Sequence, residues 1–165
     1  MPLLTPKEPG FLDEAPELVL TEVVAAATPD EVWAVFIDNE RWPEWFPAAK
    51  ECRTTSEQAE GGGSTRWIHF DLFKVNERFV AWDPPRRWAF TIVDANIPGI
   101  VSVVEQATFE AVGDDRTRVT YTLGAELKPY VRPFAAGLRW RLGSLFRAGL
   151  AGIDAQVQRL RAETG

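Results

Sequence analysis

The stretch Thr28 to Pro47, TPDEVWAVFIDNERWPEWFP, decides how the rest of this chain is arranged. Thr28 can cap a helix with its side-chain oxygen, Pro29 fits the first helical position, and acidic residues follow near the positive end of the helix dipole. Asp38-Asn39 then offers a break and a second helix start. Pro47 disfavours helical geometry at the residue before it, so the second helix ends early. The stretch predicts two short helices.

Segments with a period of two lie on both sides of this helical stretch. One ends at the Thr28 cap, and six follow, separated by turn residues such as Gly61-Gly62-Gly63 and Gly113-Asp114-Asp115. Consecutive strands with short connections pair antiparallel. The sequence therefore predicts an α+β fold with an antiparallel sheet. The expected strands are residues 18–27, 50–56, 65–73, 75–82, 88–94, 100–112 and 117–127.

The last part of the chain returns to a helical period and predicts one long C-terminal helix from about Arg132 to Glu163. Its apolar stripe comprises Leu138, Leu142, Leu145, Ile153, Val157 and Leu160. The same segment carries Gly137, Gly143, Gly149 and Gly152, and each glycine costs up to about 1 kcal/mol of helix stability relative to alanine. Two explanations stay open: the glycines let the helix approach the sheet or the short helices closely, or they leave space for a ligand.

Composition indicates one domain. The 165 residues are 45% hydrophobic, with no linker or low-complexity segment between the patterned regions, so residues 17–163 form a single predicted domain. Residues 1–16 are rich in Pro, Asp and Glu and are expected to form a flexible N-terminal arm rather than a signal peptide. The net charge of −6 argues against nucleic acid as a partner, because phosphate binding needs a basic surface.

Several kinds of chemistry lack their residues. Cys52 is the single cysteine and His69 the single histidine, so no disulfide, metal site or nucleophilic triad is expected, and no cofactor is implied. No stretch approaches the about 20 apolar residues of a membrane span. A cytoplasmic location is expected from this cysteine usage. The sequence predicts no particular oligomeric state.

Four segments resemble the START-like (SRPBCC) superfamily, in particular its polyketide cyclase/dehydrase and lipid-transport family. They are T-P-D-E-V-W-A-V-F and N-E-R-W-P-E-W-F-P in the short helices, W-D-P-P-R-R-W-A-F at a strand entry, and R-T-R-V-T-Y-T near the last strand. The resemblance covers about Leu18 to Leu160. It implies a helix-grip fold, in which a seven-stranded antiparallel sheet wraps around the C-terminal helix. It also implies an internal cavity for a lipid, polyketide, sterol or quinone, but no universal catalytic residue.

The strand phases suggest which side chains face such a cavity. If Phe109 and Tyr121 point inward, counting by twos places Val103 and Glu105 on the inner face. A bulge would put Gln106 inside instead.

A second row comes from two other strands. Trp88 and Phe90 share a face and are expected to line the interior with Trp67 and His69. The phase of the His69 strand stays open, because Ile68, Phe70 and Leu72 on its other face are at least as apolar.

His69 and Glu105 are weak catalytic candidates. A semi-buried imidazole or carboxyl can hold a pKa near neutrality and move a proton for a ligand, and it can equally make a structural hydrogen bond. The aromatic side chains of the second short helix would edge the mouth of the cavity. The residues expected to contact a ligand are Trp42, Trp45, Phe46, Trp67, His69, Trp88, Phe90, Val103, Glu105, Tyr121, Leu138 and Leu142.

Arginines gather near the C-terminus of this acidic chain, at Arg132, Arg139, Arg141, Arg147 and Arg159. They fit a solvated helix face, and alternatively an anionic ligand head group or peripheral contact with a membrane surface.

Three functions follow from the sequence. The first is binding of a hydrophobic small molecule for transfer, storage or presentation. The second is an enzyme of the polyketide cyclase/aromatase kind that uses the same cavity. The third is a protein-interaction module whose cavity is filled by tryptophans.

Overall fold

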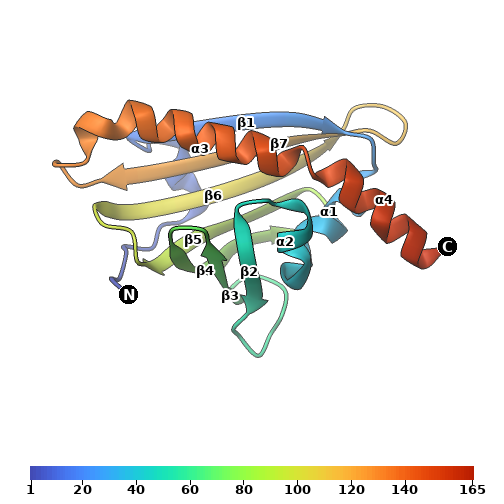
Figure 1. Cartoon of the computed structure of the whole chain (residues 1–165), viewed down its shortest axis with the longest axis horizontal. Helices are drawn as coiled ribbons and strands as arrows, with labels where there is room; N and C mark the ends of the chain where they lie inside the picture. The colour runs from blue at the N-terminus through green and yellow to red at the C-terminus, as the bar shows by residue number, and fades with distance from the viewer.

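The structure, a computed structural model of residues 1–165, has one curved sheet with a helical C-terminal segment across its concave face (Figure 1). The strands are β1 (Glu17–Ala25), β2 (Ala49–Thr54), β3 (Thr65–Phe70), β4 (Lys74–Asp83), β5 (Arg87–Ala95), β6 (Ile100–Ala111) and β7 (Thr117–Leu127). The helices are α1 (Pro29–Ile37), α2 (Trp42–Trp45), α3 (Ala135–Leu150) and α4 (Ile153–Thr164), with short 3-10 turns η1 (Pro9–Asp13), η2 (Asn39–Arg41) and η3 (Arg132–Phe134).

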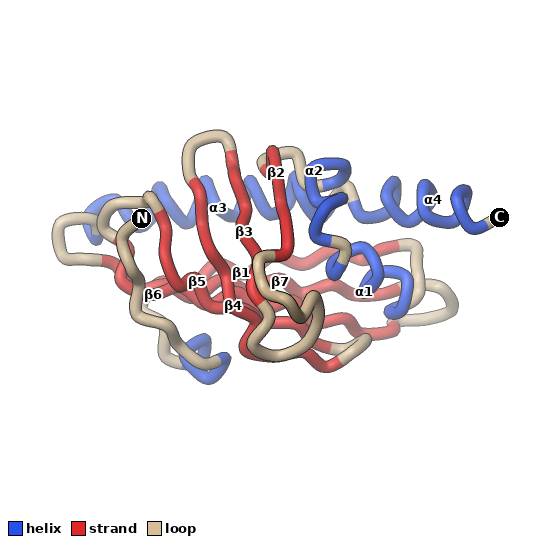
Figure 2. Tube along the Cα trace, turned by 90° about the horizontal axis from the view of Figure 1, so that it is seen from below, coloured by secondary structure: helices blue, strands red, loops and turns tan.

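The seven strands pair in the order β1-β7-β6-β5-β4-β3-β2, and all neighbouring strands are antiparallel. Strands β2 to β7 follow one another as hairpins, whereas β1 pairs with the last strand along its whole length, from Glu17↔Ala125 to Ala25↔Thr117. Figure 2 shows the sheet curling so that β2 and β3 rise toward the C-terminal helix. The predicted helix-grip fold is confirmed.

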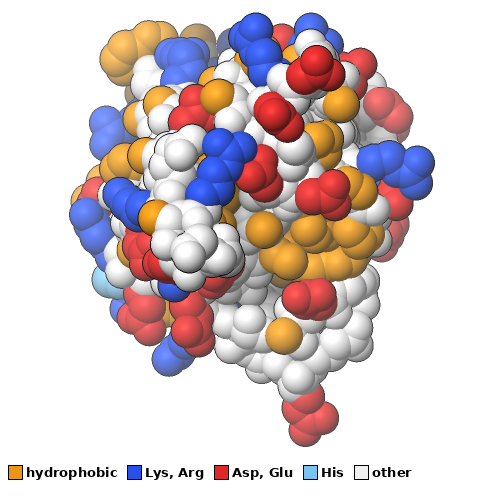
Figure 3. All heavy atoms as spheres, turned by 90° about the vertical axis from the view of Figure 1, so that its right-hand side faces the viewer, with side chains coloured by type: hydrophobic (Ala, Val, Ile, Leu, Met, Phe, Trp, Pro, Cys, Tyr) orange, Lys and Arg blue, Asp and Glu red, His pale blue; other side chains and the backbone are white.

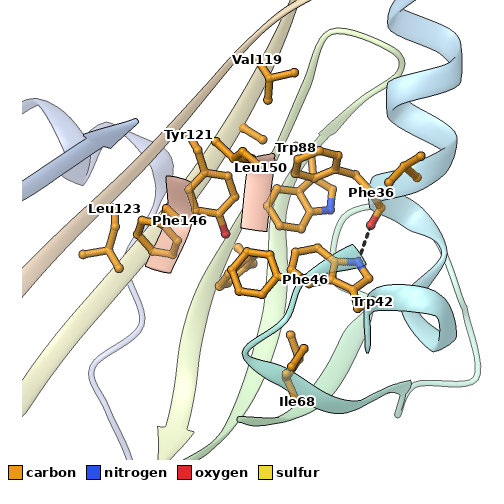
Figure 4. Packing of buried hydrophobic residues seen from close by; sticks show 14 of the residues in the cluster. Phe36, Trp42, Phe46, Ile68, Trp88, Val119, Tyr121, Leu123, Phe146 and Leu150 are labelled. Carbon is orange, nitrogen blue, oxygen red and sulfur yellow. Dashed lines mark hydrogen bonds between the residues drawn. The ribbon is translucent and has the colours of Figure 1, made fainter. Parts of the chain in front are cut away.

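The stretch Thr28 to Pro47 folds as its sequence predicts. The Thr28 hydroxyl accepts a hydrogen bond from the Glu31 amide at 3.3 Å, and the Glu31 carboxylate accepts one from the Thr28 amide at 2.9 Å. This capping box starts α1, which buries Phe36 against the sheet. The indole nitrogen of Trp42 donates to the Phe36 carbonyl at 3.0 Å and so fixes α2 beneath α1 (Figure 4).

The C-terminal helix is present as α3 and α4, joined by Ala151 and Gly152 with near-helical dihedral angles. The two glycines nearest this joint lie against α2. A Cβ on Gly152 would be 2.1 Å from the Trp45 carbonyl oxygen, and one on Gly149 would be 2.2 Å from the Phe46 ring. For these two positions, close packing on the short helix explains the glycine. No glycine of the C-terminal segment lines the cavity described below.

Ion pairs fasten α4 to the start of the chain's helical stretch. Arg161 bonds to Glu31 of α1 at 2.7 Å, and Arg41 of η2 bonds to Glu163 at 2.9 Å. Figure 3 shows blue and red side chains interspersed on this end of the molecule.

The N-terminal arm contacts the sheet. Strands β5 and β6 separate toward one end, and residues 2–5 lie between them. The Leu4 amide donates to the Val93 carbonyl of β5 at 3.0 Å, and the Thr5 amide donates to the Val101 carbonyl of β6 at 2.8 Å. The Leu4 side chain is buried in the hydrophobic core. The flexibility expected for this arm stays a prediction.

Candidate ligand cavity

A cavity of about 330 Å³ lies between the concave face of the sheet and α3. Twenty-one of its 26 lining residues are hydrophobic. The lining comes from α2 and the residue after it, from strands β3 to β7, from the β3–β4 and β5–β6 turns, from the loop after β7 and from α3. The charged lining residues are Arg66, Glu77, Glu105 and Arg141. Ligand sites in proteins are typically concave and apolar with a few placed polar groups, and this cavity has that composition.

Most of the residues that the sequence suggested for ligand contact meet at this cavity. Those that line it are Trp42, Phe46, Phe90, Val103, Glu105, Tyr121, Leu138 and Leu142. The expected inner phase of β6 is observed, with Glu105 opposite Phe90 in the register and only 9% exposed. Figure 4 shows Tyr121 pointing from β7 into the group of aromatic rings.

Trp67 and His69 lie on the other face of the sheet, so the inward phase suggested for them is wrong. Arg66 and Ile68 of the same strand point inward and are fully buried. Trp67 instead packs beneath the Arg53 guanidinium, 4.8 Å from the ring centre. His69 therefore has no access to a ligand in the cavity and drops out as a catalytic candidate. The sequence left this phase open because the inward face of β3 carries a charged residue, Arg66, beside its apolar ones.

Trp45 and Trp88 are buried behind the cavity rather than in its wall. Trp88 has no exposed surface and stacks on Trp42, with ring centres 6.1 Å apart. Trp45 packs with tilted rings against Phe36 and Trp42. Both side chains support Trp42, which does reach the cavity.

Glu105 and Tyr121 form a buried pair across β6 and β7. The Tyr121 hydroxyl donates a hydrogen bond to the Glu105 carboxyl. Burial raises the pKa of Glu105 to about 8, the charge of Glu77 adds to this rise, and the hydrogen bond from Tyr121 opposes it. Burial also raises the pKa of Tyr121 well above its usual value. Near neutral pH the pair is therefore mostly uncharged, and the Glu105 carboxyl can donate a proton or a hydrogen bond.

Arg66 is the cavity residue that sequence reasoning missed. Its Nε donates to the Glu77 carboxylate at 2.5 Å and its Nη1 to the Asn39 side chain at 3.2 Å, whereas Nη2 is buried with no partner. The guanidinium lies over the Trp42 ring, 4.2 Å from its centre. The sequence does contain a hint of this pair. Arg66 and Glu77 lie opposite each other on adjacent strands, and each stands in a row of inward-facing apolar residues.

The cavity reaches the surface beside α3. Its lining there includes Leu72 in the β3–β4 turn, Pro98 in the β5–β6 turn and Arg141 on α3, all of which are exposed. Leu72 is 78% exposed, which is unusual for a leucine that also faces an apolar cavity. We call these three residues the mouth of the cavity.

Comparisons with known proteins show the family and the fold of this chain. The model of the family described as polyketide cyclase / dehydrase and lipid transport matches residues 17–158. An uncharacterized protein of Mycobacterium tuberculosis is 28% identical over 125 residues, which are 75% of this chain and 74% of that protein.

Solved structures share the fold at low sequence identity. A START superfamily protein from Mycobacterium smegmatis superposes with a TM-score of 0.73 at 16% identity, over 87% of this chain and 98% of that one. The Zhui aromatase/cyclase from a Streptomyces species superposes with a TM-score of 0.69 at 20% identity, over 87% and 94% of the two chains. The START-like fold and the match over most of its length show that this chain belongs to the polyketide cyclase / dehydrase and lipid transport family.

Proposed function

We propose that this protein binds a hydrophobic small molecule in the cavity between the sheet and α3, for transfer, storage or presentation. The observation that carries the proposal is the cavity itself, about 330 Å³ in volume and walled mainly by apolar side chains. Transfer of apolar surface out of water contributes roughly 25 cal/mol per Å² and would supply most of the affinity. The unpartnered Nη2 of Arg66 and the Glu105–Tyr121 pair would fix the ligand's orientation through an oxygen atom.

A cavity-filling variant tests the binding proposal. Leu142 lines the cavity from α3, so Leu142→Trp should fill part of its volume. With 1-aminoanthracene, a small neutral fluorophore, as the probe, we expect saturable binding at one site per chain. We expect Leu142→Trp to weaken this binding at least tenfold in a fluorescence titration.

The control places the same side chain outside the cavity. Leu20 on β1 is 60% exposed and does not line the cavity, so Leu20→Trp should bind the probe like the unchanged protein. The proposal fails if the unchanged protein shows no saturable binding, or if Leu142→Trp binds as tightly as Leu20→Trp while remaining folded by circular dichroism.

A second candidate function is an enzyme that folds or dehydrates a reactive carbonyl chain in the same cavity. It is favoured by the buried Glu105–Tyr121 pair, because a carboxyl with a pKa of about 8 is suited to general acid catalysis near neutral pH. The family to which the chain belongs is described by cyclases and dehydrases as well as by lipid transport. Confinement of the chain would supply much of the acceleration.

Substitution of the acid separates an enzyme from a carrier. Once a ligand has been identified by native mass spectrometry and organic extraction, Glu105→Gln should abolish any turnover of it in an enzyme. In a carrier there is no turnover to lose, and the variant should keep most of its affinity. Glu110→Gln, on the exposed part of the same strand, is the matched control.

The interaction-module alternative would require a filled cavity. The tryptophans do not fill it, since only Trp42 of the seven reaches its wall. Peripheral membrane contact through the exposed Leu72 at the mouth would suit a transfer role. No helix is long and apolar enough to cross a membrane. The cytoplasmic location stays a prediction.

A further inference from the structure

The mouth of the cavity carries one cation that faces the ligand space. Arg141 lines the cavity, lies exposed at its edge and makes no salt bridge within 4.0 Å. The neighbouring Arg139, by contrast, is paired with Glu17 of β1. Arg141 therefore keeps its charge available at the point where the cavity meets water.

Other cations near Arg141 in the sequence add to the positive electrostatic potential around it. Residues 128–153 contain five cations and no acidic residue, although the whole chain carries a net charge of −6. The five are Lys128, Arg132, Arg139, Arg141 and Arg147. This segment forms α3 and the loop that precedes it, and it contributes a local positive field to an otherwise acidic molecule. Such a field raises the local concentration of small anions.

The inner end of the cavity, unlike the mouth, disfavours a negative charge on a ligand. Arg66 is already neutralised there by Glu77, and the Glu105 carboxyl lies close enough to Glu77 for its pKa to rise. A ligand carboxylate at this end would lose its hydration and face two further carboxyl groups, which is costly in an apolar interior. A negative charge on the ligand is therefore favoured at the mouth and disfavoured at the inner end.

From this polarity we infer that the ligand is an amphiphile with a single acidic head group, whose apolar body fills the cavity and whose anion lies at the mouth against Arg141. This inference rests on the proposed ligand-binding function and specifies the chemical class. The guanidinium can hold a carboxylate through two parallel hydrogen bonds. The head group keeps part of its hydration, so its charge is retained without the desolvation penalty of a buried ion.

A matched pair of ligands tests the charge. Decanoate and decanamide have nearly the same size and shape, but only decanoate is anionic at pH 7. By calorimetry at low ionic strength, below the micelle concentration, we expect decanoate to bind about five- to tenfold more tightly than decanamide, as a charge-assisted hydrogen bond allows. We expect Arg141→Gln to remove this preference, so that decanoate binds no more tightly than decanamide.

Arg147→Gln is the control variant, because Arg147 is exposed on the same helix and does not line the cavity. It should retain most of the preference for decanoate. Equal binding of the two ligands to the unchanged protein overturns the inference but leaves the binding function standing. Persistence of the preference in Arg141→Gln also overturns it, since the anion is then held elsewhere. Failure of both ligands to bind, while 1-aminoanthracene still binds, overturns this inference alone. Failure of all three to bind contradicts the binding function itself.

Discussion

The polar side chains of the cavity are few, and each depends on a partner. Burial removes the hydration of the Arg66 guanidinium, and the ion pair with Glu77 and the contact with the Trp42 ring compensate for this loss. Glu105 is tolerated because it can stay protonated beside Tyr121. Substitutions at these residues should therefore affect stability in ways that depend on charge, and pH becomes a direct probe of the cavity.

Glu105→Gln should change how stability depends on pH. The pKa of the Glu105 carboxyl is about 8 in the folded protein against an ordinary value of 4.5, so the folded state holds the proton more tightly than the unfolded state. The stability of the unchanged protein then falls through Glu105 as the pH rises from about 4.5 to 8. Relative to it, Glu105→Gln should gain up to about 1.4 kcal/mol per pH unit across this window, measured by urea unfolding.

Glu110→Gln is again the control, because Glu110 is exposed at the end of β6 and pairs with Arg118 in solvent. It should show no comparable trend. A constant difference between Glu105→Gln and the unchanged protein from pH 5 to pH 9 would show that Glu105 is not perturbed by burial.

Arg66→Met should be strongly destabilising, because it leaves the Glu77 carboxyl buried without a counter-charge. Removing one partner of a buried ion pair typically costs about 3–5 kcal/mol of unfolding free energy. The double variant Arg66→Met with Glu77→Met should recover most of this loss, since no buried charge remains. If the double variant is as unstable as the single one in chemical denaturation, the loss arises from packing and not from charge.

At the scale of elements, the short helix α2 determines where the C-terminal helix can run. Gly149 and Gly152 pass directly over Phe46 and the Trp45 backbone, so α4 can continue across the end of the sheet. Before the α3–α4 joint, α3 packs along β1 at the edge of the sheet, and the cavity lies between α3 and the inner face of the other strands. The C-terminal segment is therefore tightly packed against α2 at this joint, whereas a cavity remains beside α3.

Gly152→Ala should be destabilising although alanine favours helices. The new Cβ would lie 2.1 Å from a backbone oxygen that has little freedom to move, and overpacking of this kind costs about 1–3 kcal/mol. Gly137→Ala is the matched control, because nothing lies within 4 Å of the new Cβ, and it should stabilise by up to about 1 kcal/mol. Equal effects of the two substitutions on the thermal unfolding midpoint would rule out the close contact.

The elements could be predicted from sequence because their signals are local. The Thr28 cap, the turn glycines and the alternating strands are each read within a few residues. The phase of β6 could be predicted as well, since Phe109 anchors it and no bulge intervenes before Glu105. The phase of β3 could not, because Arg66 owes its inward position to Glu77, a residue on the next strand. The matching positions of Arg66 and Glu77 become informative only once the register of the two strands is known.

At the scale of the whole molecule, the wall of the cavity depends on the N-terminal arm, which fills the gap between β5 and β6. Strands β5 and β6 stop pairing near the cavity, and residues 2–5 of the N-terminal arm satisfy the amides and carbonyls that are left. The Ala95 amide, for example, donates to the Pro2 carbonyl at 3.1 Å. The arm thus completes the sheet next to Ile92 and Val103, which line the cavity.

Deletion of residues 1–5 should open this part of the sheet. We expect the Ala95 amide to exchange with solvent at least tenfold faster, because it loses its acceptor. The Phe79 amide, which donates to the Ser64 carbonyl at 2.9 Å far from the arm, should be unaffected. In the full chain, rapid exchange at the Leu4 amide would show that the arm is flexible, and slow exchange would show that it stays in place.

The pairing of β1 with β7 has a consequence for synthesis of the protein in the cell. The first strand finds its partner in the last, and Glu17 must wait for Ala125 before it can pair. At translation rates of about 5–20 residues per second, that interval lasts roughly 5–20 s. During it, the half-apolar β1 has an unpaired edge on both sides and is open to association with other nascent chains. Chaperone dependence should therefore be greatest while the middle of the chain is being made, and it should end abruptly once β7 emerges from the ribosome.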